Sequence, residues 1–130
     1  MNKYFEKVKN YLLELEYSIV KEDPENNFFI VEKEEALIKN MVIDIDAPIV
    51  LIDQVLFKVK GDNPEVFKKL LQKNRDIIHG AFMLDESGEI VSFRDTLEAE
   101  NLDLNELEGS LNSLTLLLNE YANQILSFVK

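Results

Sequence analysis

Residues 41–59, MVIDIDAPIVLIDQVLFKV, form the most strand-like stretch of this 130-residue chain. Met41, Ile43 and Ile45 recur at every second position, which is the spacing of a β-strand that buries one face. Ala47-Pro48 interrupts the pattern, and a longer apolar run then continues to residue 59. The stretch therefore predicts two consecutive strands.

The residues before this stretch predict a helix followed by a hairpin. From residue 3 to residue 16, apolar side chains recur at steps of three and four, as on the buried face of a helix. Residues 17–20 and 28–31 are rich in β-branched and aromatic residues, and the turn-forming residues 23–27 separate them. We expect these two segments to be the first two strands of a sheet.

The residues after it predict a second helix and a second hairpin. Asp62-Asn63-Pro64 combines capping side chains with a proline suited to a first helical turn. Helical spacing of apolar residues continues to His79, and Gly80 is placed to end the helix. Residues 81–93 contain two short apolar runs around an Asp-Glu-Ser-Gly turn, which is typical of a hairpin.

A long final helix is expected from Asp103, whose spacing to Glu106 is that of a capping box. Its apolar residues recur in steps of three and four: Leu104, Leu107, Leu111, Leu114, Leu118, Tyr121, Ile125 and Phe128. This spacing is compatible with a coiled coil, but the flanking positions lack the paired charges that set partner choice. The apolar face is also widened beyond a narrow seam, by Leu116, Leu117 and Leu126. A helix packed across a sheet is therefore the favoured interpretation.

The order of elements is α-β-β-β-β-α-β-β-α, with no repeat, linker or low-complexity segment. This order predicts an α+β fold in which helices cover one face of an antiparallel sheet. A chain of this length supports one hydrophobic core, so we expect a single domain over residues 1–130.

The composition excludes several classes of protein. The chain has 14 Lys and Arg against 25 Asp and Glu, a net charge of −11, and residues 81–130 hold 2 of the former and 10 of the latter. Affinity for phosphate backbones comes from Lys and Arg, so neither nucleic acid nor an anionic membrane is an expected partner. The acidic region predicts either a solvating surface or attraction of a basic partner.

The sequence also predicts the compartment. It has no cysteine, which removes disulfides, thiolate zinc sites and thiol nucleophiles. The N-terminal MNKYFEKVKNYLLELEY reads as an amphipathic helix and not as an export signal. No apolar run reaches the ~18 residues of a membrane helix. We expect a soluble, cytoplasmic protein.

Few residues suggest catalysis or metal binding. His79 lies at an expected helix end, where a capping role is the simpler interpretation. Asp44, Asp46 and Asp53 could gather on one face of neighbouring strands as ligands for Ca²⁺ or Mg²⁺, but no calcium-loop pattern accompanies them. We therefore expect no metal, no cofactor and no enzymatic activity. An enzyme centred on these residues remains the third and least supported hypothesis.

Arg94 is almost isolated among acidic residues in the C-terminal part of the chain. We expect it to pair with a nearby carboxylate, either Asp95, Glu98 or Glu100.

Two apolar groups are candidates for contact with other molecules. The strand over residues 49–59 carries apolar residues on both alternating faces, so one face either meets a partner or is buried within the monomer. The second helix offers an alternative dimer surface, to be weighed against simple core packing. The candidate residues are Ile49, Leu51, Val55, Phe57, Val66, Phe67, Leu70 and Leu71.

Several segments resemble a known family. They are Leu70-Leu71-Gln72-Lys73-Asn74, Gly80-Ala81-Phe82-Met83-Leu84, Gly88-Glu89-Ile90-Val91, Phe93-Arg94-Asp95-Thr96-Leu97 and Leu102-Asp103-Leu104-Asn105-Glu106-Leu107. With the N-terminal half they are similar to type III secretion chaperones of the Tir-chaperone type and to the related YbjN-like domains. The resemblance covers nearly the whole chain.

This resemblance implies a small acidic α+β protein that forms a homodimer and catalyses no reaction. Members of the secretion branch hold an extended segment of a client protein along exposed apolar surface. YbjN-like members are linked to regulation or stress. The leading hypothesis is therefore a chaperone-like protein that binds a client segment, and the alternative is a regulatory domain that contacts a folded partner.

Overall fold

The computed structural model describes residues 3–128, apart from the side chains of Ile125, Leu126 and Phe128. The expected contributions of those three side chains to the last helix therefore lie outside the described part. The elements are α1 (Lys3–Glu14), β1 (Ser18–Asp23), β2 (Phe28–Lys33), the short 3-10 helix η1 (Glu34–Ala36), β3 (Ile38–Asp46), β4 (Ile49–Lys58), α2 (Pro64–Asn74), β5 (Ala81–Leu84), β6 (Ile90–Glu98) and α3 (Leu104–Phe128).

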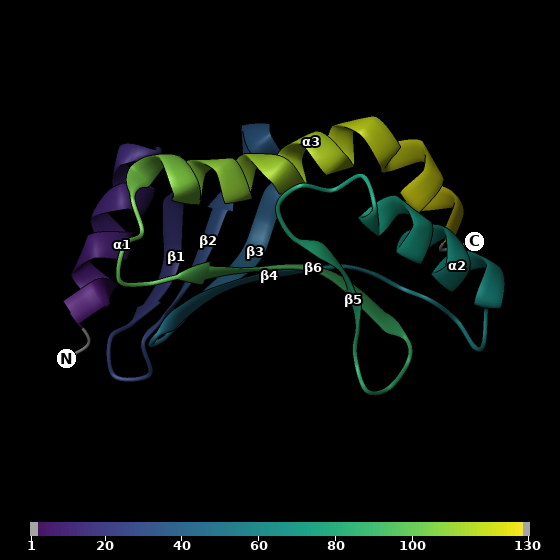
Figure 1. The fold of residues 1–130 in the computed structure, drawn as a ribbon, viewed down its shortest axis with the longest axis horizontal. Helices are drawn as coiled ribbons and strands as arrows, with labels where there is room; N and C mark the ends of the chain where they lie inside the picture. Colours follow the sequence, from purple (N-terminus) through teal and green to yellow (C-terminus); the bar gives the residue numbers. More distant parts are fainter. Residues whose placement is uncertain (1–2, 129–130) are drawn as a thin grey trace.

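The strands form one six-stranded sheet in the order β1-β2-β3-β4-β6-β5, and every neighbouring pair is antiparallel. All three α-helices lie on the same side of this sheet (Figure 1). The predicted α+β class, the element order and the one-sided arrangement of helices are therefore confirmed.

The core lies between the sheet and the helices. Helix α1 buries Phe5, Val8 and Leu12, as its spacing predicts. The ring of Phe5 stacks on that of Phe29 in β2, with centroids 4.3 Å apart. Central strands bury every second residue on this side, including Ile43 and Ile52.

Helix α3 packs across the sheet, as the favoured interpretation predicts, and within residues 3–128 it forms no coiled coil. It buries Leu107, Leu111, Leu114 and Leu117 against the core. Polar contacts fix its position: Ser110 Oγ donates to Asp95 Oδ2 of β6 at 2.6 Å, and Thr115 Oγ1 donates to the carbonyl of Ala36 at 2.8 Å.

Two predicted boundaries are wrong. Helix α2 ends at Asn74, not at His79. The Asn74 side chain bonds to the backbone of Phe82, accepting from its N–H at 2.8 Å and donating to its carbonyl at 3.4 Å, so the chain leaves the helix to meet β5. Strand β6 also continues past Phe93 to Glu98, because β4 offers backbone partners along that whole length.

Candidate protein-binding surfaces

The side of the sheet opposite the helices carries apolar residues that no described element covers (Figure 1). Alternation along β2, β3 and β4 places these side chains away from the core. We call this side the open face, and its large apolar residues are Phe28, Ile30, Val42, Ile49, Leu51 and Val55. Most are half-buried by their neighbours on the sheet, and Val55 is 63% exposed.

Strand register determines which open-face side chains touch. Val42 lies opposite Ile30 on one side and Asp53 on the other. In the neighbouring row, Asp44 lies between Phe28 and Leu51. Directly opposite residues in antiparallel strands share a face and lie within side-chain contact. The open face is therefore an apolar surface with carboxylates set into it.

Of the four β4 residues predicted for a partner surface, Ile49, Leu51 and Val55 lie on the open face, but Phe57 does not. The register between β4 and β6 shifts between Val55 and Phe57. This bulge inserts one residue, so Phe57 turns toward the helices and is only 8% exposed. Simple alternation predicts Phe57 on the same face as Val55. This prediction is wrong because the bulge interrupts the alternation between the two residues.

The predicted surface on the second helix is also divided by the structure. Val66 and Leu70 are buried in the core, so they are not on the monomer's surface. Phe67 is half-buried, and Leu71 is 69% exposed. Core packing therefore uses one side of α2 and leaves the side with Leu71 accessible.

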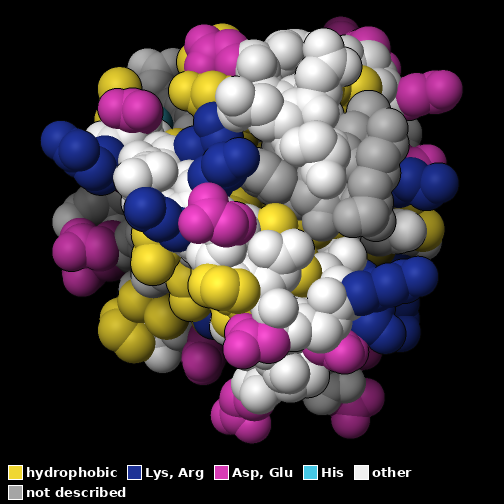
Figure 2. All heavy atoms as spheres, turned by 90° about the vertical axis from the view of Figure 1, so that its right-hand side faces the viewer, with side chains coloured by type: hydrophobic (Ala, Val, Ile, Leu, Met, Phe, Trp, Pro, Cys, Tyr) yellow, Lys and Arg dark blue, Asp and Glu magenta, His cyan; other side chains and the backbone are white. Residues whose placement is uncertain are grey.

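An apolar groove runs between α2 and the β5–β6 hairpin. It is lined mainly by Phe67, Leu71, Met83, Leu84 and Val91. Met83 and Leu84 are both substantially exposed, as is Leu71. Figure 2, which faces the α2 end of the molecule, shows hydrophobic side chains at the surface between Lys and Arg side chains and Asp and Glu side chains.

The two sides of this groove differ in charge. On α2, Lys68 lies three residues before Leu71, a spacing that places residues side by side on a helix, and Arg75 caps the helix four residues after Leu71. On the other side, the β5–β6 turn carries Asp85 and Glu86. The groove is therefore basic along one edge and acidic along the other.

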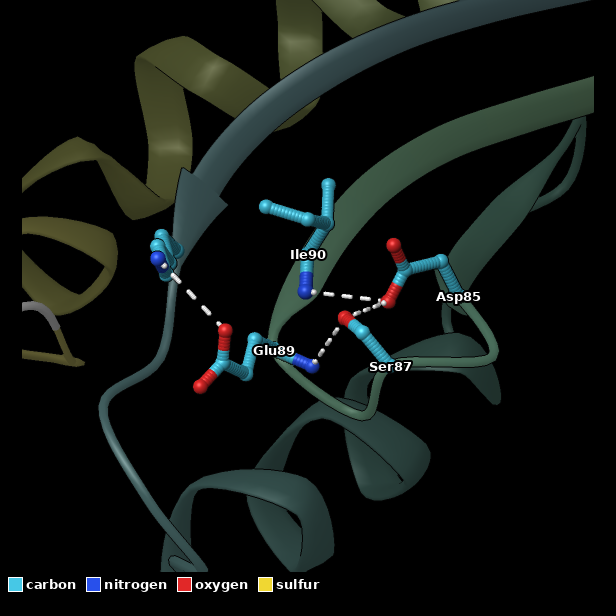
Figure 3. Close-up of polar contacts among 5 residues, drawn as sticks. Asp85, Ser87, Glu89 and Ile90 are labelled. Atoms are coloured by element: carbon cyan, nitrogen blue, oxygen red, sulfur yellow. Dashed lines mark hydrogen bonds and ion pairs between the residues drawn. The ribbon is translucent and has the colours of Figure 1, made fainter.

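The β5–β6 turn is ordered by its own side chains (Figure 3). Asp85 Oδ1 accepts from Ser87 Oγ at 2.6 Å and from the Ile90 N–H at 3.2 Å. These bonds favour the carboxylate and lower the pKa of Asp85. Glu89 also pairs with Lys58 at 3.5 Å. The predicted interpretation of this segment as a hairpin turn is confirmed.

Arg94 pairs with Asp53 on β4 and not with the carboxylates near it in sequence. Its Nε and Nη2 atoms donate to Asp53 Oδ2 at 2.9 Å and 2.7 Å. The predicted partners are wrong because β4 and β6 register these two residues directly opposite each other on the open face.

The carboxylates considered for a metal site lie on the open face but are spread over it. Asp44 and Asp46 are two residues apart on β3, and Asp53 is held by Arg94. Burial, and to a smaller extent the charge of Asp46, raise the pKa of Asp44. Within residues 3–128, no group of three His, Asp or Glu residues is arranged to hold a metal ion.

His79 lies in the loop after α2 and not at a helix end. Its side chain is exposed, and its carbonyl accepts from Ser113 Oγ of α3 at 2.7 Å. A shallow pocket between this loop and α3 has Ile78, 89% exposed, and Leu116, 59% exposed, among its lining residues. The prediction that Leu116 widens the buried face of the last helix is wrong, and no pattern in the sequence indicates that Leu116 or Ile78 is exposed.

Within residues 3–128, no helix has the length and hydropathy to cross a membrane.

Comparisons with known proteins agree on the fold. The structure of the HopA1-SchA chaperone-effector complex matches with a TM-score of 0.65 and 13% identity, covering 90% of this chain and 92% of that one. YbjN from E. coli matches with a TM-score of 0.68 and 10% identity, covering 92% and 91%. An uncharacterized protein from Methanothermobacter thermautotrophicus matches with a TM-score of 0.62 and 18% identity, covering 98% and 99%.

The family follows from a different comparison. No curated protein matches the chain. A family model described as CesT_Tir_1 matches residues 1–130. Because this match spans the full length, the chain belongs to the CesT_Tir_1 family, a family of type III chaperones.

Proposed function

We propose that this protein is a cytoplasmic, non-enzymatic binding protein that holds an extended or amphipathic segment of another protein against the open face. The observation that carries the proposal is the row of apolar residues, among them Ile30, Val42 and Leu51, on the side that no described element covers. A contiguous apolar surface that neighbouring elements leave partly exposed is typical of an interaction site. The fold shared with the HopA1-SchA chaperone-effector complex supports this proposal.

Photo-crosslinking from chosen positions tests the proposal. A photoreactive amino acid is placed at Val55, on the open face, and a matched variant carries it at Leu13, which is 52% exposed on α1. Both variants are expressed in the native cell and the cross-linked peptides are identified by mass spectrometry. We expect Val55 to capture one recurrent segment from a partner and Leu13 to capture none.

The identity of the captured segment separates the alternatives. A segment that is unstructured in its own protein supports the chaperone-like role. A segment from within a folded domain favours the regulatory role, in which the partner is already folded. Equal capture from Val55 and Leu13 would contradict the proposal, because the open face would then have no preference for a partner.

We further propose that the protein forms a homodimer through the groove between α2 and the β5–β6 hairpin. Leu71, Met83 and Leu84 supply exposed apolar area there. A two-fold axis brings each patch against its own copy, so the basic edge with Lys68 meets the acidic edge with Glu86 twice. Of the predicted residues on α2, Phe67 and Leu71 remain in this proposal.

A further inference from the structure

The distribution of charge on the open face defines what kind of segment it fits. Two neighbouring rows of cross-strand residues lie at the end of the sheet near the β1–β2 and β3–β4 turns. One row runs Asp23, Phe28, Asp44, Leu51 and Thr96. The other runs Asp46, Ile49 and Glu98. We call these two rows the acidic end of the open face.

The acidic end combines apolar side chains with three carboxylates, Asp44, Asp46 and Glu98, that form no ion pair with a described residue. Its register positions contain no Lys or Arg. Among the described residues, no ion pair reaches Asp44, Asp46 or Glu98. The adjacent row differs, because there Arg94 neutralises Asp53 and Lys21 lies opposite Ile30. The Lys21 ammonium also reaches the edge of the acidic end, 5.4 Å from the centroid of the Phe28 ring, so the missing counter-charge is confined to Asp44, Asp46 and Glu98.

Asp44 is a carboxylate of the acidic end that forms no ion pair with a described residue. Its carboxylate is half-buried between Phe28 and Leu51, and Asp46 lies on the same face of the strand. A partly desolvated carboxylate beside a like charge is unfavourable unless a cation approaches it. An apolar segment without charge would cover Asp44 and worsen this cost, and an acidic segment would add repulsion.

We infer that the segment held by the open face carries Lys or Arg residues between its apolar ones, and that Asp44, Asp46 and Glu98 select it by charge. This inference rests on the proposed function. The apolar residues of the segment contact Phe28, Leu51 and Ile49, and its cations lie against the neighbouring carboxylates. The apolar and cationic residues that face the rows therefore occupy every second position of the segment, because side chains on one face of an extended segment recur at every second residue.

Three short synthetic peptides test the inference: at every second position one carries Leu and Lys in turn, one Leu and Glu, and one Ser and Lys, and all three have Ser at the positions between, so that the compared side chains share one face of the extended peptide. Their binding to the full-length protein is measured by fluorescence anisotropy at low and high salt. We expect the Leu-Lys peptide to bind most tightly and to weaken as salt is raised, because exposed charges are screened. The Leu-Glu and Ser-Lys peptides should bind much more weakly.

Two matched double variants locate the effect. Asp44→Asn with Asp46→Asn removes two charges from the acidic end, and Glu14→Gln with Glu108→Gln removes two exposed charges from helices on the other side of the sheet. We expect the first variant to lose about fivefold to tenfold in affinity for the Leu-Lys peptide and the second to lose little. Equal losses would overturn the inference, since net charge alone would then account for binding.

The outcomes separate this inference from the proposed function. If the Leu-Lys and Leu-Glu peptides bind equally and Leu51→Ser weakens both, charge selection fails and the apolar binding surface stands. If Ser-Lys binds as tightly as Leu-Lys, the inference fails because apolar contact is not needed. If Leu51→Ser has no effect on any peptide that binds, the open face is not the site and the proposed function fails as well.

Discussion

Gly80 occupies a position that requires glycine for two separate reasons. Its φ is +88°, in the region that other residues rarely adopt, and a Cβ there would collide with the ring of Phe93. We expect Gly80→Ala to lower the free energy of unfolding by about 2–5 kcal/mol, the sum of backbone and overpacking costs. Gly88→Ala is the control: its φ is +77° and its added Cβ meets nothing, so a loss of about 1–2 kcal/mol is expected. Denaturant titration measures both, and equal losses would show that Phe93 is not the obstacle.

Asp44 is expected to cost stability at neutral pH. Because burial and Asp46 raise its pKa in the folded protein, folding favours the protonated form. Its favourable contribution is present below its ordinary pKa and is lost as the pH rises through the raised one. Asp44→Asn should therefore stabilise the fold at neutral pH, with a gain that shrinks in acid. Thermal unfolding across pH measures the gain, and a destabilised variant at neutral pH would contradict this account.

Tyr17 makes the free energy of unfolding depend on pH in the alkaline range. Burial, with smaller effects of Glu108 and Glu35, raises its pKa from 10.0 to about 12. Its contribution to stability is complete below pH 10 and is lost as the pH rises toward 12. We expect the free energy of unfolding to fall more steeply over this interval in the wild type than in Tyr17→Phe. Parallel slopes would mean that the phenol is solvated in the folded state.

Helix α3 has neighbouring leucines with opposite surroundings. Leu114 is fully buried, whereas Leu116 is 59% exposed. We expect Leu114→Ala to lower the free energy of unfolding by about 2–5 kcal/mol, because it leaves a cavity in the core. Leu116→Ala should change it by less than about 0.5 kcal/mol. Chemical denaturation of both variants measures the difference, and similar losses would mean that α3 does not pack on the sheet as described.

Sequence patterns predict those helices and caps that depend on residues close to one another in the chain. The steps of three and four in α3 and the cap at Asp103, which accepts from the Glu106 N–H at 2.7 Å, are visible in sequence. The end of α2 is not visible in sequence, since it depends on the side chain of Asn74, which accepts from the N–H of Phe82, eight residues further along. The bond of Arg94 to Asp53 depends on strand register across 41 residues.

The candidate binding surfaces are only partly predictable for the same reason. Leucine, valine and isoleucine in β4 predict an apolar strand, but the inward orientation of Phe57 depends on the bulge after Val55. The apolar residues of β2 and β3 on the open face, such as Ile30 and Val42, join the surface only through pairing. A sheet face is assembled from segments far apart in the chain, so no single stretch encodes it.

The proposed homodimer predicts which of two matched leucine substitutions changes the oligomeric state of the protein. Leu71→Glu places a carboxylate in the apolar groove beside α2, and Leu13→Glu makes the same change at a similarly exposed leucine on α1. We expect the wild type and Leu13→Glu to sediment as dimers at low micromolar concentration and Leu71→Glu to sediment as a monomer. A dimer's melting temperature should also rise with protein concentration. A strictly monomeric wild type would remove the homodimer from the proposal.

The bulge in β4 has a consequence for how this chain tolerates change. Up to Val55, the even-numbered residues of β4 face the helices, whereas beyond it the odd-numbered Phe57 does. A complete substitution scan of β4 should therefore show sensitivity with a period of two that reverses phase at Leu56. Deleting Leu56 would remove the extra residue and leave the Phe57 ring facing the helices and the Lys58 ammonium facing outward, because Phe57 would then directly follow Val55. The extra residue at this point therefore separates two parts of β4 whose inward-facing positions are out of phase in sequence but share one face of the sheet.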